Sequence, residues 1–207
     1  CVASQLQGWA WKERLAEAGG ALGVQVLTFG HLYRTILIAS GQASTLLDDA
    51  MQHSLLRYTL GGAPLAHFAS VRDKPGFVVL LHNLIAELKA ARIDPQRLGN
   101  AVAKLGDEPR LRELVWVYRA YQESLRANRW ADEEELGWLA LRALKDNPRM
   151  ASDWSLLVVD GFDNLTTVQL DLVRLMAGRA GETIITLSGA VGGPERGLVQ
   201  RRFLATR

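Results

Sequence analysis

The chain has 207 residues, 48% of them hydrophobic and 22% charged, which is enough apolar material to bury a core in one domain or in two small ones. Its 24 Lys and Arg residues against 22 Asp and Glu residues leave a formal charge of +2, so no global field draws it to nucleic acid or to an anionic membrane. The single cysteine, Cys1, excludes an internal disulfide and a cysteine metal cluster, and no apolar run approaches the roughly 18 residues of a membrane span, so we predict a soluble cytoplasmic protein without a membrane partner.

The first predicted elements are a helix, a strand and a helix. Residues 4–18 carry apolar side chains at approximately helical spacing, with Ser4 in the position of an N-cap. The run VQVLTF, Val24 to Phe29, has the β-branched and apolar composition of a short strand. The segment after it predicts a helix that begins near His31.

The next hundred residues carry no strand signal and predict a block of helices. Asp73 and Asp132 stand at N-cap positions within this block. Helical patterns and Pro or Gly breaks place the helices at about 45–59, 63–71, 75–91, 94–105, 108–128 and 132–145.

Two buried strands are predicted after the helical block. The run SLLVVD, Ser155 to Asp160, is apolar and closes on an acid, as is typical of a strand buried on both faces of a parallel sheet. A helix capped by Asn164 or Thr166 follows to about Arg179, and ETIITL, Glu182 to Leu187, predicts the second strand. Strand, helix and strand in this order predict a right-handed parallel unit. The fold class is therefore α/β, with a large all-helical insertion.

Asp160 is a candidate site residue because of its place at the end of a strand. An acid at the carboxyl end of a buried parallel strand stands where open α/β folds bind ligands. In phosphate-loop nucleotidases such an Asp holds Mg²⁺, and a neighbouring Glu positions the attacking water. The neighbour here is Gly161, which has no side chain. By spacing alone, a simple cap of the following turn is the favoured interpretation of Asp160, and it stays open.

The stretch VDGFDNLTTVQLDLVRLM, Val159 to Met176, resembles motif II of the UvrD/Rep-type superfamily-1 helicases, VDEFQDTNPLQ followed by a Leu-rich helix. The glutamate of that motif is Gly161 here, its glutamine is Asp163 and its second aspartate is Asn164. Loss of the glutamate removes the group that orients and deprotonates water, so we expect hydrolysis to be very weak. The positions that match in register are Val159, Asp160, Phe162 and Gln169, and among them Asp160 and Gln169 form the predicted relic of a nucleotide and Mg²⁺ site.

The change to DGF, followed by a T-x-x-Q-L-x-L helix, is similar to the B subunit of the AddAB and RexAB type of ATP-dependent helicase–nuclease. The segments VQVLTFGHLYRTIL, KPGFVVLLHNLIAELKAARIDPQRL and LVWVYRAYQESLRANRWADEEEL also resemble this family, so the likeness extends from Val2 to about Leu187. It implies the phosphate-loop NTPase-like parallel sheet of a superfamily-1 helicase, in part. Residues 1–44 and 148–207 would form an incomplete domain 1A, and residues 45–147 the helical insertion 1B.

The resemblance implies a DNA repair and recombination function with no ATP hydrolysis in these residues. We expect an inactivated motor domain that binds or scaffolds DNA during double-strand-break processing, beside a separate A-type subunit that supplies the active motor. The alternative is a protein–protein interaction platform that does not contact DNA, and both stay open. Whether the full-length protein acts as an ATP-dependent helicase or exodeoxyribonuclease subunit is also open.

Cofactors are expected outside these residues. No G-x-x-x-x-G-K-[ST] loop occurs in the sequence, and the chain begins at Cys1 rather than at a methionine, so we expect a piece of a longer protein. ATP and Mg²⁺ would bind only if a phosphate loop lies upstream. The resemblance also implies a nuclease domain far downstream, with an iron–sulfur cluster in many members. The run GAVGGPERG, residues 189–197, lacks the Gly-Asp-x-x-Gln core of helicase motif III and predicts a flexible connection.

Two groups of residues are candidates for contact with DNA. By resemblance, Thr28, Phe29 and His31 would line a single-strand path, with Ser4 counted beside them; the alternative is that Phe29 is core and His31 merely begins a helix. The second group, Arg112, Arg119 and Arg126, recurs every seven residues and therefore stands on one helix face, which could follow a DNA backbone or be simply solvated. Most of the six Trp residues are expected to serve packing, and no residues are predicted to be catalytic or to bind a metal.

Overall fold

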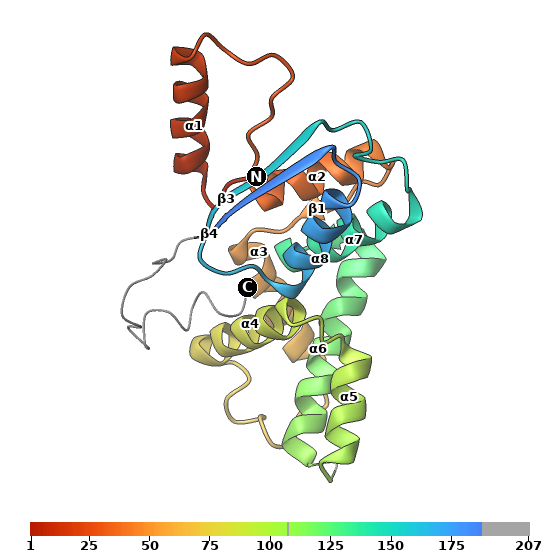
Figure 1. The fold of residues 1–207 in the computed structure, drawn as a ribbon. Helices are drawn as coiled ribbons and strands as arrows, with labels where there is room; N and C mark the ends of the chain where they lie inside the picture. The colour runs from red at the N-terminus through yellow and green to blue at the C-terminus, as the bar shows by residue number, and fades with distance from the viewer. Residues whose placement is uncertain (107, 188–207) are drawn as a thin grey trace, which may run out of the picture. The chain divides into compact units, whose positions relative to one another are not determined.

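The computed structural model describes residues 1–106 and 108–187 (Figure 1). The described chain is mixed α/β, largely helical, and contains two small parallel sheets. It divides into two compact units: residues 43–136 form one, which we call the helical unit, and residues 1–42 with the described residues from 137 onward form the other, the α/β unit. The run at 189–197 lies outside the described residues.

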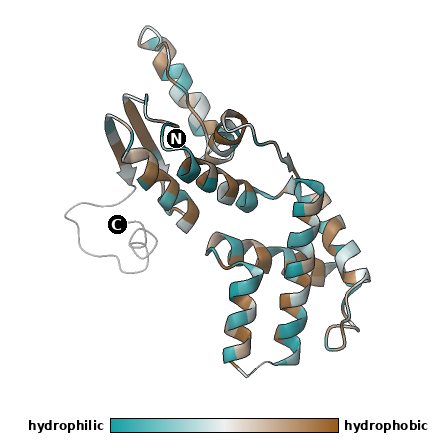
Figure 2. Ribbon diagram, turned by 90° about the vertical axis from the view of Figure 1, so that its right-hand side faces the viewer, coloured by the Kyte–Doolittle hydropathy of each residue, from teal (hydrophilic) through white to brown (hydrophobic). Residues whose placement is uncertain are grey.

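The α/β unit is built on two parallel strands. β3 (Leu156–Phe162) pairs with β4 (Glu182–Leu187), with an irregularity in register between Val159 and Phe162. Val2 forms an isolated parallel bridge with Asp160, so β3 lies between Val2 and β4. Figure 2 shows both strands largely in the brown of hydrophobic residues. The two predicted strands and their parallel pairing are therefore confirmed, but the predicted burial of the second strand is wrong, since Ile184 is 43% and Ile185 46% exposed.

The helices of the α/β unit begin at residues whose side chains cap them. Ser4 caps α1 (Gln5–Glu17) and Thr166 caps α8 (Thr167–Ala177), each in a reciprocal capping box that satisfies backbone N–H groups of the first turn. Both caps agree with the sequence prediction. The remaining helices of this unit are α2 (Phe29–Ala39) and most of α7 (Glu133–Asp146).

The predicted strand from Val24 to Phe29 is wrong. Residues 24–28 are extended but carry no strand, and α2 already begins at Phe29. Composition alone predicted the strand, but a strand also needs a ladder of hydrogen bonds. Within the described residues this segment is joined to a neighbour at one point, where the N–H of Val2 donates to the carbonyl of Leu27 at 2.9 Å.

The helical unit contains four helices of its own in the described residues. Each of the last three begins with a proline at its first turn, where the missing N–H costs no hydrogen bond. A core of apolar side chains from α3, α4 and α6 fills its centre, and Figure 1 shows α5 and α6 side by side. The helices are α3 (Asp49–Gly61), α4 (Pro75–Ala90), α5 (Pro95–Lys104) and α6 (Pro109–Asn128).

Three predictions for the helical unit are wrong. Residues 63–71 form turns rather than a helix, and the N-cap of α4 is Lys74 rather than Asp73. Two short strands, β1 (Thr45–Leu46) and β2 (Trp130–Ala131), pair in parallel where none was predicted. Strands of two residues are too short for a periodic pattern to reveal them.

Candidate functional site

The carboxylate of Asp160 is held by the chain's own side chains. The indole N–H of Trp11 in α1 donates to Oδ2 at 2.8 Å, and the hydroxyl of Thr186 in β4 donates to Oδ1. The hydrogen bond from Thr186, and then that from Trp11, lower the pKa of Asp160 below its ordinary value, so the group is a carboxylate at neutral pH. Both of its oxygens therefore already have donors within the α/β unit.

Gly161 adopts a backbone conformation that suits glycine alone. Its φ is +77°, in the left-handed region that other residues enter at a cost. A Cβ placed on it would lie 2.5 Å from Nε2 of Gln7, which is closer than non-bonded atoms allow. Gln7 thus fills the space in front of the position where motif II carries its glutamate.

The same Gln7 side chain closes the N-terminus of α1. Its Oε1 accepts hydrogen bonds from the backbone N–H groups of Ala3 at 3.1 Å and Ser4 at 3.2 Å, while the backbone N–H of Gln7 donates to Oγ of Ser4 at 3.2 Å. Free N–H groups at a helix N-terminus are what a phosphate binds. These N–H groups are already used within the α/β unit, and we refer to Asp160, Gly161, Gln7, Trp11 and Thr186 together as the Asp160 site.

Other predicted residues of the α/β unit serve local structure. Thr28 caps α2 and shares a 2.9 Å hydrogen bond with Nδ1 of the exposed His31. Phe29 is only 4% exposed, and its ring meets that of Phe162 edge-on at 5.1 Å, so it lies in the core and offers no free ring face for stacking. Gln169 is the third residue of the α8 capping box, and its Oε1 accepts from the N–H of Thr166 at 2.9 Å.

The arginine stripe of the helical unit shares its helix face with an aromatic ring. Arg112, Arg119 and Arg126 are exposed on α6. Trp116 and Glu123, at intermediate positions of the same face, are exposed as well. Trp116 was expected to pack, but it is 36% exposed. The signal that could have placed it outside is its spacing, four residues after Arg112 and three before Arg119.

A buried ion cluster in the helical unit was not predicted from the sequence. Nζ of Lys89, which is fully buried, donates to both carboxylate oxygens of Asp132 at 2.7 Å and lies 3.2 Å from Oε2 of Glu135. Nε2 of Gln122 donates to that same Oε2 at 2.6 Å, and the hydroxyl of Tyr121 donates to Asp132 at 3.2 Å. Because the N–H of Glu135 donates to Asp132 at 2.8 Å, the predicted capping role of Asp132 is confirmed.

Glu113 explains why residues 63–71 are not helical. Its Oε1 accepts from the N–H groups of Ala66 at 2.8 Å and His67 at 2.7 Å, and its Oε2 accepts from the N–H of Phe68 at 3.0 Å. The carboxylate thus supplies acceptors for three consecutive backbone donors, as a helical turn would have done. Desolvation opposes ionisation of Glu113, but the donors from His67, Phe68 and Ala66 outweigh it and hold its pKa below the ordinary value of 4.5.

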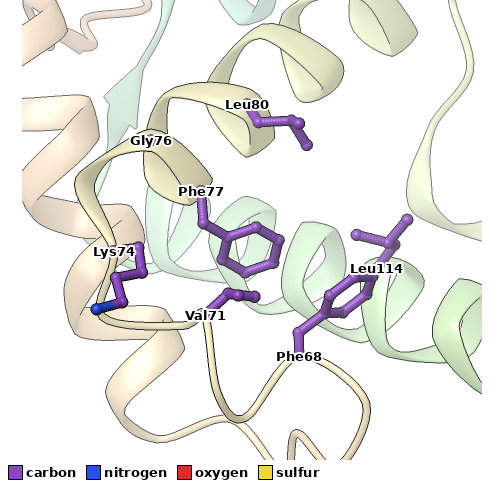
Figure 3. Close-up of a pocket in the computed structure, with 7 residues that line it drawn as sticks. All are labelled: Phe68, Val71, Lys74, Gly76, Phe77, Leu80 and Leu114. Atoms are coloured by element: carbon purple, nitrogen blue, oxygen red, sulfur yellow. The ribbon is translucent and has the colours of Figure 1, made fainter.

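An apolar pocket adjoins the loop that Glu113 holds. The rings of Phe68 and Phe77 face its interior, with Leu114 beside Phe68, while the ammonium of Lys74 points away from the rings (Figure 3). The loop supplies Phe68 and Val71, so the pocket exists only while the loop is held. Its lining residues are Phe68, Val71, Lys74, Gly76, Phe77, Leu80 and Leu114, and its volume is about 360 Å³.

We expect Glu113→Gln to lower the free energy of unfolding by about 1 kcal/mol at neutral pH, because one neutral carbonyl oxygen replaces two charged acceptors at a partly exposed site. The folded-state pKa of Glu113 is lowered, so its stabilisation is fully present above the unfolded value of 4.5 and is lost as pH falls through the folded value. Urea unfolding between neutral and acid pH should show the difference between wild type and variant shrinking to zero. Glu123→Gln, at an exposed position of the same helix, is the matched control and should leave stability unchanged; a difference that persists in acid would contradict the assignment.

The fold and the Asp160 site together define a mixed α/β protein in which a carboxylate within β3 accepts hydrogen bonds from the first helix and from β4. A family model described as "ADDB, N-terminal" matches residues 13–195. The chain belongs to this family. No helix in the described residues has both the length and the apolar character that crossing a membrane requires.

Several curated relatives are each named as the B subunit of an ATP-dependent helicase/deoxyribonuclease. The chain is 26% identical over 180 residues to that of Desulforamulus reducens, covering 83% of this chain and 15% of the relative. It is 30% identical over 179 residues to that of Desulfitobacterium hafniense, covering 83% and 14%, and 29% identical over 187 residues to that of Moorella thermoacetica, covering 84% and 16%. The chain therefore spans about a sixth or less of the length of these relatives.

Proposed function

We propose that the chain is an inactivated helicase-like region of the B-type polypeptide of a helicase–deoxyribonuclease. It has a phosphate-loop NTPase-like core of the superfamily-1 type and binds or scaffolds DNA during double-strand-break processing. It works beside an A-type subunit and hydrolyses no ATP itself. The names of its relatives support the wider assignment, and the closed Asp160 site carries the loss of hydrolysis.

The proposed inactivity is supported by the groups around Asp160 and by the lack of a phosphate-loop motif in these residues. Such a loop joins a strand to the N-terminus of a helix, close to the acid of the neighbouring strand. The sequence contains no such loop, and the connection from Val2 to Ser4 that lies beside Asp160 has its backbone N–H groups bound by Gln7. Trp11 and Thr186 already donate to the Asp160 carboxylate, and Gly161 offers no side chain to orient water, which supports the loss of hydrolysis.

We predict that the 207-residue chain shows no saturable binding of ATP in the presence of Mg²⁺ and no phosphate release above background. Asp160→Ala should leave both measurements at the same baseline, because this carboxylate serves the contact with Trp11 and not a nucleotide. Calorimetric titration with ATP and a phosphate-release assay would check this. A measurable ATPase activity that Asp160→Ala abolishes would overturn the proposal.

The DNA part of the proposal has a rival in a protein–protein platform. The apolar pocket at Phe68 and Phe77 favours the rival, because exposed apolar pockets often receive partner side chains. Affinity for DNA measured against salt separates the two. Contacts between arginine and phosphate give a logarithmic fall in affinity with salt, whereas a platform that never meets DNA gives no binding even at low salt.

A further inference from the structure

A second groove lies on the helical unit, between the C-terminal part of α3 and the middle of α6. Tyr58, Thr59, Gly61 and Gly62 line one side, and Trp116, Ala120 and Ser124 line the other; the groove measures about 460 Å³. All of these residues belong to the helical unit. None of the residues that line the groove belongs to the buried ion cluster or to the apolar pocket at Phe68.

Aromatic rings are what this groove offers to a ligand. Tyr58 is 80% exposed and Trp116 is 36% exposed, although both are large and partly apolar. No atom lies within 4 Å of a Cβ built on Gly61, so the floor beside the rings is open. A flat ring system can therefore enter the groove from solvent.

The hydroxyl groups of the groove are already used within the helices. The hydroxyl of Thr59 donates to the carbonyl of Leu55 at 2.8 Å, and that of Ser124 donates to the carbonyl of Ala120 at 2.9 Å. A ligand would therefore be held by stacking rather than by a specific pattern of hydrogen bonds. Stacking of this kind accepts every base, since each base has a π face.

Exposed arginines lie on the same two helices as the rings. Arg57 precedes Tyr58 on α3, and Arg119 and Arg126 share the exposed face of α6 with Trp116. Glu123 is the one exposed acid between them on that face. Exposed aromatic rings with guanidinium groups on the same helices complement a chain that carries flat bases and a phosphate at each unit. The bases of a duplex are paired and stacked inside, so the complement is a single strand.

We propose that the groove of Tyr58 and Trp116 is a stacking site for the bases of single-stranded nucleic acid, with Arg119 and Arg126 contacting the phosphates. This inference rests on the DNA-binding part of the proposed function and assigns it to particular residues. It predicts little preference for sequence and a preference for single strands over duplex.

The test is fluorescence anisotropy with the 207-residue chain and labelled oligo(dT) of about 20 nucleotides, at several salt concentrations. Tyr58→Ala and Trp116→Ala should each weaken binding about 10-fold without changing the salt slope, and Trp116→Phe should keep most of the affinity. Arg119→Gln and Arg126→Gln should each reduce the slope of log affinity against log salt by about 0.7. Trp9→Ala, which removes a tryptophan that is 66% exposed on α1, is the matched control and should change nothing.

The binding results distinguish a failure of DNA binding as a whole from a failure of the groove as its site. If the wild-type chain does not bind oligo(dT) at low salt, both the DNA part of the proposed function and this inference fail. If it binds but Tyr58→Ala and Trp116→Ala bind equally well, or if an abasic oligomer binds as tightly as oligo(dT), the inference is overturned while the proposed function stands. Tyr58 is too exposed for its removal to unfold the chain, and thermal melts by circular dichroism show whether Trp116→Ala remains folded.

Discussion

Gly161→Glu, which writes the glutamate of helicase motif II back into the chain, is expected to destabilise the protein and to leave ATP hydrolysis undetectable. The new Cβ would meet Nε2 of Gln7 at 2.5 Å, and the residue would hold a φ of +77° that only glycine adopts freely. The left-handed backbone costs about 1 to 2 kcal/mol, and moving the Gln7 amide out of its hydrogen bonds with Ala3 and Ser4 costs about 1 kcal/mol more, so we expect the free energy of unfolding to fall by about 2 to 3 kcal/mol. Urea unfolding and phosphate release measure the two effects.

Two further variants separate the clash from the strain. Gly161→Ala carries the same Cβ without the charge and should lose most of the same stability. Gln7→Gly combined with Gly161→Ala removes the clashing side chain, so the pair should be less destabilised than the sum of the single variants, with about 1 to 2 kcal/mol of backbone strain remaining. Additive effects would show that Gln7 does not fill the space before Gly161. Hydrolysis by Gly161→Glu would show that the Asp160 site still accepts ATP.

Local signals in the sequence were enough to place several elements of this fold. Ser4 and Thr166 have side chains that accept from the backbone two or three residues later, so their capping roles depend on near neighbours alone. The apolar runs of β3 and β4 likewise marked both segments as strands, although the burial that they predicted fails for β4, where Ile184 and Ile185 are exposed. Where an element depends on a distant residue the prediction was wrong, as at residues 63–71, whose N–H groups are bound by Glu113.

In the Asp160 site, too, the sequence shows the features that depend on near neighbours and not the contacts between distant residues. The missing glutamate is visible at Gly161 in the sequence, and so is the acid of Asp160 at the end of its strand. The groups that close the site are not visible, because Trp11 and Asp160 are 149 positions apart and nothing in α1 marks Trp11 as a donor to that carboxylate. The spacing of Ser4 and Gln7 is that of a capping box, but nothing in the sequence shows that Gln7 also lies in front of Gly161.

Lys89→Met is expected to have the largest effect in the helical unit, lowering the free energy of unfolding by about 4 kcal/mol. The substitution keeps the length of the side chain but removes the cation, and it leaves the carboxylates of Asp132 and Glu135 buried without their ion partner. Breaking a buried ion pair by removing one partner costs about 3 to 5 kcal/mol, mostly from the stranded charge. Urea unfolding followed by circular dichroism measures the loss.

The controls for Lys89→Met test whether the cost comes from stranded charge or from lost packing. Tyr121→Phe removes one hydrogen bond to Asp132 and should cost about 1 kcal/mol. Adding Asp132→Asn and Glu135→Gln to Lys89→Met neutralises both stranded carboxylates, so the triple variant should be more stable than Lys89→Met alone. If the triple variant is instead less stable, the cluster works through packing and geometry rather than charge.

The buried ion cluster also touches the helix that carries Trp116, because Tyr121 and Gln122 join it from α6. A loss of oligo(dT) binding in Lys89→Met, with full recovery in the triple variant, would show that the balance of buried charge keeps the groove in its binding shape.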